Sequence, residues 1–132
     1  MTEATFPTAP DADALERGSV LSPSFDADGL VAAILQHAQT GEVLMLGWMN
    51  AEALRRTLEE GEVWFFSRRR QALWRKGETS GQSQKVIEAR IDCDQDAILV
   101  KVAPQGDGGV CHVGFPACFY RVIEDGALRE RP

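Results

Sequence analysis

The sequence predicts a β-rich α+β fold in a single small domain with one central helix. Short runs of β-branched and apolar residues, separated by turn-forming residues, are typical of β-strands. One segment instead has helix start and stop signals at its two ends. The 132 residues contain no internal repeat and fit the size of one domain.

The N-terminus is expected to differ from the rest of the chain. Residues 1–18 are interpreted as a flexible lead-in, and residues 19–132 as the folded domain. Residues 2–10 are rich in Thr, Ala and Pro, as in many poorly packed termini. Residues 11–17 fit a short helix, because Gly18 follows them as a stop signal.

The first two strands are predicted to form a hairpin. Val31–His37 and residues 43–48 are both apolar, and Thr40-Gly41 between them marks a turn.

The central helix is predicted over Ala51–Glu60. Asn50 is a favourable N-cap residue, and Gly61 supplies the stop. Leu54 and Leu58 lie one turn apart and are expected to form its apolar stripe.

The remaining strands follow from aromatic and β-branched content. They are predicted at residues 63–67, 86–91, 97–102 and 119–123, with loops at 79–81 and 105–109 and a turn at 125–126.

Charge and composition exclude some classes of function. The formal net charge of −6 disfavours non-specific nucleic-acid binding. The longest apolar runs are about ten residues or shorter, too short to cross a membrane. No basic segment followed by an apolar stretch marks a signal peptide, so we expect a cytoplasmic location.

An acidic pentapeptide is the densest chemical signal. In an extended segment, Asp92, Asp94 and Asp96 would share one face, and Cys93 would point to the other. Oxygen ligands suit a hard ion such as Mg²⁺, whereas a thiolate suits zinc. The pentapeptide is therefore a candidate for two metals on opposite faces.

Two alternatives to this metal site exist for the pentapeptide. An EF-hand loop would need Gly and Glu where the chain has Ala97 and Ala103, so this reading is rejected. A solvated acidic turn between strands is about as frequent for such a triplet and stays open.

The chain has three cysteines: Cys93, Cys111 and Cys118. An odd count argues against a disulfide framework, and the spacing is not that of a structural zinc knuckle. A single cysteine is more often an inert core residue, but three within 26 positions are hard to explain by packing. Three protein ligands leave a fourth zinc position open, where the pKa of water falls to about 7.

The two histidines have different contexts. His112 follows a cysteine, and its free pKa near neutrality suits a general acid or base, although its ring could simply hydrogen-bond a neighbouring carbonyl. His37 lacks such a context and is read as structural or exposed.

A basic segment precedes a Gly/Ser/Thr loop. Its cations are Arg68, Arg69, Arg70, Arg75 and Lys76, with no acid between them. Guanidinium groups and loop amides can hold phosphate, but such charge runs are usually solvated turns.

These motifs together resemble the phosphoribosyl-AMP cyclohydrolase family of histidine biosynthesis, over roughly residues 26–121. The matching runs are Gly41 to Asn50, Phe66-Ser67-Arg68, Leu73-Trp74, Lys76 to Gly81, Asp92 to Asp96, and Cys111-His112 through Cys118-Phe119. The resemblance implies hydrolytic opening of the N1–C6 bond of the adenine ring of phosphoribosyl-AMP. It also implies an intertwined homodimer, in which the zinc cysteines come from both subunits.

Site roles follow from the same resemblance. It implies zinc at Cys93, Cys111 and Cys118, and magnesium at Asp92, Asp94 and Asp96. His112 is the catalytic candidate. The substrate-binding candidates are Ser67, Arg68, Arg70, Trp74, Lys76, Glu78, Thr79, Ser80 and Gly81.

The chain departs from the family pattern at a few positions. The family often has His where this chain has Gln82, sometimes His at Arg75, and commonly Ser at Ala117. Some members carry a second, pyrophosphohydrolase domain, and the end of this chain at Pro132 suggests that this activity is absent.

Two other classes of protein have partly similar sequence features. A nucleobase deaminase would carry His-x-Glu with Pro-Cys-x-x-Cys, and neither motif occurs here. A non-catalytic zinc module that binds an anionic partner would need a fourth protein ligand, which closes the metal site.

Overall fold

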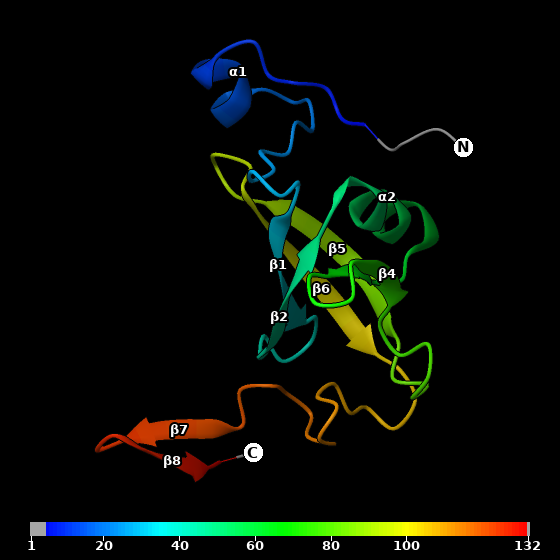
Figure 1. The fold of residues 1–132 in the computed structure, drawn as a ribbon, viewed down its shortest axis with the longest axis vertical. Coiled ribbons are helices and arrows are strands. Elements are labelled where there is room, and N and C mark those ends of the chain that lie inside the picture. The colour runs from blue at the N-terminus through cyan, green and yellow to red at the C-terminus, as the bar shows by residue number, and fades with distance from the viewer. Residues whose placement is uncertain (1–4, 132) are drawn as a thin grey trace.

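The computed structural model describes residues 5–131, which contain two helices and eight strands. A four-stranded sheet with the order β2-β1-β6-β5 forms the centre (Figure 1). Its members are β1 (Val31–His37), β2 (Val43–Met49), β5 (Gln84–Ile91) and β6 (Ala97–Pro104). The predicted β-rich α+β class is confirmed.

The pairing of β1 explains the topology of this sheet. β1 pairs antiparallel with β2, which confirms the predicted hairpin, and parallel with β6 on its other side. Parallel neighbours need a long connection, and here the chain between β2 and β5 supplies it. β5 then turns directly into β6 as an antiparallel pair.

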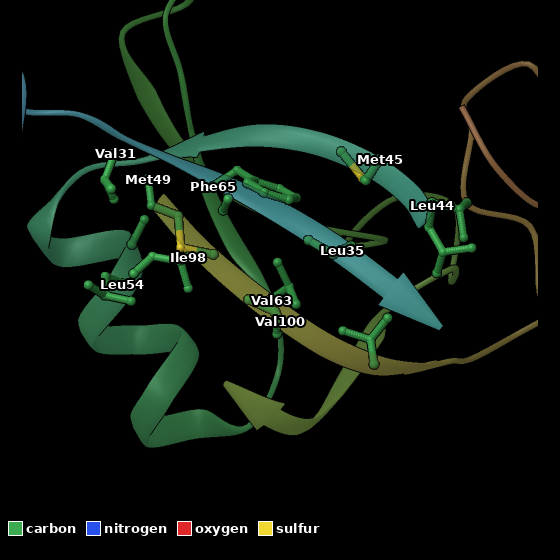
Figure 2. Close-up of a cluster of buried hydrophobic side chains, with 14 of the residues drawn as sticks. Val31, Leu35, Leu44, Met45, Met49, Leu54, Val63, Phe65, Ile98 and Val100 are labelled. Atoms are coloured by element: carbon green, nitrogen blue, oxygen red, sulfur yellow. The ribbon is translucent and has the colours of Figure 1, made fainter. Parts of the chain in front are cut away.

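One face of the sheet is covered by α2 (Ala51–Glu60) and by the small β3–β4 sheet, Trp64–Ser67 and Ala72–Arg75. Alternate residues of β6 point into this core, because side chains alternate along a strand. The buried members of β6 are Ile98, Val100 and Val102. Figure 2 shows how side chains of the helix and of several strands meet in this cluster.

Helix α2 begins and ends as predicted. The Asn50 side chain accepts a hydrogen bond from the Ala53 amide at 2.8 Å, which satisfies a free donor of the first turn. Gly61 ends the helix with a left-handed φ of 74°, a conformation that glycine adopts without a Cβ clash. Neither helix in residues 5–131 has the length and apolar character to span a membrane.

The buried stripe of α2 differs from the prediction. Ala53, Leu54 and Thr57 are buried, whereas Leu58 is 42% exposed. Thr57 takes the place expected for Leu58, because its hydroxyl donates to the Ala53 carbonyl at 2.8 Å and accepts from the Trp64 amide at 2.9 Å. This buried hydroxyl joins the helix to the start of β3.

Two strands were missed by the sequence analysis. β4 lies inside the basic segment, for which no strand was predicted, and β8 (Ala127–Glu130) follows the predicted turn at 125–126. Its partner β7 (Arg121–Glu124) begins two residues later than expected. All four residues of β8 are exposed, so no apolar alternation marks it.

The N-terminal lead-in is attached to the domain where the structure describes it. α1 (Ala12–Arg17) has no buried residue, but the Phe6 and Phe25 rings lie 6.2 Å apart beside the core. The buried side chain of Gln95 bonds to the main chain of Leu15 and Ser22. Residues 1–4 of the predicted flexible segment lie outside the described residues.

We expect Thr57→Val to lower the free energy of unfolding by about 1–3 kcal/mol, because the partly buried Trp64 amide loses its partner. Urea unfolding measures this loss. Thr40→Val is the matched control, since the exposed Thr40 hydroxyl accepts only from the Glu42 amide at 3.2 Å. Equal effects of the two substitutions would contradict the role of Thr57.

Candidate functional site

The acidic pentapeptide forms a turn between β5 and β6, as in the alternative of an acidic turn between strands, and it is not the extended segment that would place Cys93 opposite the aspartates. The Gln95 amide donates to the Asp92 carbonyl at 3.1 Å, and Gln95 has a left-handed φ of 57°. The Asp92 carboxylate accepts from the Asp96 and Ala97 amides at 2.9 and 3.1 Å. These main-chain bonds outweigh the strand tendency of the neighbouring residues and reverse the chain.

The turn nevertheless gathers the three carboxylates. Oxygen atoms of Asp92, Asp94 and Asp96 lie within 4.8 Å of one another. Within residues 5–131 this is the only group of three such side chains with metal-ligand spacing. Three oxygen ligands suit a hard cation, so the donor set fits magnesium.

The carboxylates shift one another's pKa. Hydrogen bonds with Asp94 and Asp92 raise the pKa of Asp96 to about 6, because the proton is shared within the cluster. For Asp92, partial burial alone would raise the pKa. Hydrogen bonds from Asp96 and from the Ala97 amide outweigh that effect and lower it. Below about pH 6 the cluster therefore binds a proton, which would compete with a cation for the same oxygen atoms.

Cys111 and Cys118 lie together at the other end of β6. The Cys111 amide donates to the Phe115 carbonyl at 3.0 Å, which closes a tight turn. The Cys118 amide donates to the Leu44 carbonyl at 2.7 Å, which attaches the loop to β2. Burial and the neighbouring Cys111 thiol raise the pKa of Cys118 to about 11.

Lys76 lies beneath this cysteine pair. It is 8% exposed, and its ammonium group donates to the Val110 carbonyl. Burial lowers the pKa of Lys76, while the Cys118 and Cys111 thiols act in the opposite direction. Lys76 therefore binds the cysteine loop in the structure. The sequence had indicated only a role in phosphate binding.

Cys93 is remote from the other two cysteines. It is exposed in the acidic turn, and the eight residues of β6 lie between that turn and the Cys111–Cys118 loop. A strand of this length spans roughly 23 Å, whereas zinc holds a sulfur at about 2.3 Å. Figure 1 shows the β5–β6 turn near α1 and the segment after β6 at the far end. One chain alone cannot bring the three thiols together.

A hollow of about 520 Å³ joins the cysteine loop to the basic segment. Its walls come from β4, from the loop after it and from the 110–118 loop. The predicted site residues that line it are Arg70, Trp74, Lys76, Glu78, Thr79, Ser80, His112 and Cys118. Segments that are far apart in the sequence therefore share one cavity.

At Gly77, the loop after β4 lies very close to the main chain of Gln82 and Ser83. Gly77 has a φ of 85°, and a Cβ there would lie 2.2 Å from the Ser83 amide nitrogen. Gln82, where the family often has His, donates to the Asp107 carboxylate at 2.9 Å. The Gly109 amide and, to a smaller extent, this bond from Gln82 lower the pKa of Asp107. Gln82 therefore joins the two glycine-rich loops.

A second hollow of about 570 Å³ lies beside the first and shares Met45 and Trp74 with it. The predicted residues Ser67 and Arg68 line this second cavity instead. The Arg68 guanidinium lies 4.7 Å from the centre of the Trp48 ring. Gly81 lines neither hollow.

Sequence reasoning missed Trp48 and Met45 as wall residues. Trp48 follows a glycine at the end of an apolar strand, where a large, half-buried aromatic ring is a usable signal. Nothing in the sequence distinguishes Met45 from a core residue. Its role in the walls of both hollows is visible only in the structure.

The arginines of the β3–β4 turn have no acidic partner. In the described part of the chain, no carboxylate lies within 4.0 Å of the guanidinium groups of Arg68, Arg69 or Arg70. Arg75 differs, because it pairs with Glu62 at 3.1 Å. Positive charge is thus concentrated at the hollows of a chain with a net charge of −6.

The two histidines lie in different surroundings. His112 is exposed at the first hollow. His37 caps a turn through Nδ1, which accepts from the Gln39 and Thr40 amides at 3.2 Å, so its structural reading is confirmed. A third hollow of about 580 Å³ lies under the lead-in and contains none of the predicted site residues.

Comparison with known proteins points in one direction. A family model described as phosphoribosyl-AMP cyclohydrolase matches residues 45–120. A relative of that name from Caulobacter sp. (strain K31) is 68% identical over 126 residues, covering 96% of this chain and 94% of the relative. Another from Caulobacter vibrioides (strain NA1000 / CB15N) is 61% identical, covering 99% and 94%. One from Rhodopseudomonas palustris (strain ATCC BAA-98 / CGA009) is 54% identical, covering 93% and 80%.

The raised pKa of Asp96 predicts a pH-dependent effect on stability. A carboxyl group whose pKa is higher in the folded state favours folding when protonated and opposes it as the pH rises through about 6. Asp96→Asn should therefore raise the thermal unfolding midpoint at about pH 7.5 in chelator, but not at about pH 4.

Circular dichroism at the two pH values measures this difference. Asp28→Asn, an exposed substitution outside the cluster, serves as the control. A midpoint for Asp96→Asn at or below that of the unsubstituted chain at the higher pH would contradict the assignment.

Proposed function

The chain belongs to the phosphoribosyl-AMP cyclohydrolase family, and from that premise we propose that it hydrolyses the N1–C6 bond of the adenine ring of phosphoribosyl-AMP in the histidine pathway. The observation that carries this proposal is the hollow shared by His112, Cys118 and the basic loop. This cavity combines an acid/base group, a metal ligand and anion-binding groups.

The two adjacent hollows fit a substrate with a phosphate at each end. Phosphoribosyl-AMP joins a phosphoribosyl group to a nucleoside monophosphate, so its two phosphates flank the purine ring. Arg68 and Ser67 would hold one phosphate in the second hollow, and Arg70 with the loop at Thr79 and Ser80 the other. Guanidinium forks bind phosphate strongly. Trp74 lies between the hollows, where an aromatic ring can stack on the purine.

Zinc is the metal that the thiols fit. Cys111 and Cys118 offer two neighbouring soft ligands, and Cys93 of a second copy would supply the third. When bound, zinc supplies the Lewis acidity that makes water nucleophilic at neutral pH. The buried Lys76 ammonium, which is held by the Val110 carbonyl, fixes the cysteine loop and favours charged thiolates.

The other site residues act around the reacting ring. His112 is exposed beside Cys118 and would accept a proton from the attacking water and return it to N1 as the C6–N1 bond breaks. Asp92, Asp94 and Asp96 would hold magnesium, which suits oxygen ligands and would orient a phosphate or hydroxyl of the substrate.

A homodimer would complete the site. Ile34 lies opposite Leu46 and beside Leu99, so an apolar row crosses the sheet on the face that α2 leaves uncovered. Leu46 is 46% exposed. Contact with a second copy through this face would bury the row.

The β7–β8 hairpin supports the same assembly. It stands apart from the central sheet (Figure 1), and its Ile123 and Leu128 side chains are 78% and 57% exposed. An isolated two-stranded hairpin is at best marginally stable in water. Intertwining with a second copy would give it a partner.

We expect Cys118→Ala to abolish both turnover and zinc content. The loss of turnover is measured by the absorbance change on ring opening, with and without chelator, and zinc by elemental analysis. Val113→Ala, in the same loop but 55% exposed, should keep both.

The turnover and zinc measurements together distinguish a zinc hydrolase from a non-catalytic zinc module. Chelator-sensitive turnover that returns with zinc supports the proposed chemistry. Full activity in zinc-free Cys118→Ala would exclude it, and bound zinc without ring opening in the unsubstituted chain would favour a non-catalytic zinc module.

A further inference from the structure

Gln95 differs from every other side chain of the acidic turn. Asp92, Cys93, Asp94 and Asp96 are exposed, whereas Gln95 is only 4% exposed. An uncharged amide thus points inward from a turn whose other side chains point to solvent.

The buried amide of Gln95 is bonded at both of its polar atoms. Its Oε1 accepts from the Ser22 amide at 2.7 Å, and its Nε2 donates to the Leu15 carbonyl at 2.8 Å. The Val20 carbonyl lies 3.4 Å from the same nitrogen. One side chain therefore ties together three points of the N-terminal segment.

The main chain repeats this attachment. The Ser24 amide donates to the Gln95 carbonyl at 2.7 Å. The Ser24 hydroxyl donates to the Asp94 carbonyl at 3.1 Å. Residues 15–24 and the acidic turn are thus joined through both peptide groups that flank the Gln95 Cα.

The backbone conformation of Gln95 is one that other residues adopt more easily. Its φ of 57° lies in the left-handed region, which Gly and Asn occupy at lower cost than longer side chains. Gly has no side chain to bond, and Asn is one methylene shorter. Gln is therefore kept at an unfavourable φ where its length allows it to reach residues 15 and 22.

We propose that Gln95 is a positioning residue, which fastens residues 15–24 to the acidic turn and so fixes the placement of Cys93 and the three aspartates. This inference deepens the proposed function, because the turn matters to catalysis only if it holds metal. The fastening itself is independent of that function. Leu15 to Ser24 is then part of the ligand-bearing unit and would enter the composite site with it.

The test uses Gln95→Asn in the full-length chain. Asn keeps the amide and tolerates the left-handed backbone, but its shorter side chain cannot span to both Ser22 and Leu15. Gln71→Asn is the matched control, since Gln71 also has a left-handed φ of 52° but is exposed and donates only to the Arg68 carbonyl at 2.7 Å.

Amide hydrogen exchange by NMR in metal-free protein is the first measurement. In Gln95→Asn, the Ser22 and Ser24 amides should exchange about tenfold faster, because their acceptors are lost or displaced. The Asp96 and Ala97 amides, which report the turn itself, should exchange at least about threefold faster. Gln71→Asn should leave all four rates unchanged.

Mn²⁺ binding by electron paramagnetic resonance is the second measurement, with Mn²⁺ in place of Mg²⁺ on oxygen ligands. The Mn²⁺ dissociation constant should rise about threefold to tenfold in Gln95→Asn, because the carboxylates lose their fixed spacing. In the control it should stay constant. This pattern is not expected if Gln95 only adds general stability, since both variants remain folded under the conditions of the measurement.

The two measurements distinguish a failure of the role of Gln95 from a failure of the proposed magnesium site. Unchanged exchange at Ser22 and Ser24 would overturn the fastening. Faster exchange there with unchanged rates at Asp96 and Ala97 would overturn the positioning role. Absence of Mn²⁺ binding in the unsubstituted chain would instead contradict the proposed magnesium site, while the exchange rates still decide the role of Gln95.

Discussion

The length and burial of strand β6 constrain every other part of this site. β6 is paired on both sides, with β1 and β5, and its alternate side chains fill the core, so it behaves as a rigid spacer. The acidic turn with Cys93 precedes it, and the loop with Cys111 and Cys118 follows it. Because the spacer cannot fold back, a three-thiol site requires a second chain, as we propose.

The two ends of β6 are built to stay in place without metal. At one end, Gln95 and the Asp92 carboxylate bind main-chain amides and hold the turn. At the other end, the Cys118 amide ties the cysteine loop to β2, and the Val110 carbonyl of the same loop accepts from the buried Lys76 after β4. Ligands that are already ordered lose little conformational entropy when a metal binds. Preorganised ends also allow two copies to complete each other's site.

Local signals in the sequence were sufficient for the central helix and the β1–β2 hairpin, because Asn50, Gly61 and the Gly41 turn act on their immediate neighbours. The sequence left an extended segment and an acidic turn both open for residues 92–96, since the bonds that bend this segment depend on the left-handed Gln95 and on Ser24, 70 residues away. β4 was not predicted, because the charged residues on both sides of it suggested a solvated turn. The motif resemblance indicated the site residues, but only the fold revealed that Trp48 and Met45 line the hollows and that Lys76 is buried.

We propose that Cys93 of one copy completes the site of another, and mixed-subunit complementation tests this assembly most directly. Cys93→Ala and Cys118→Ala proteins, each inactive alone, are unfolded together, refolded as a mixture and assayed for ring opening and bound zinc. About half of randomly paired dimers are mixed, and each has one intact site of two, so about one quarter of the unsubstituted activity should return. No recovery in a mixture shown to contain mixed dimers would contradict the account.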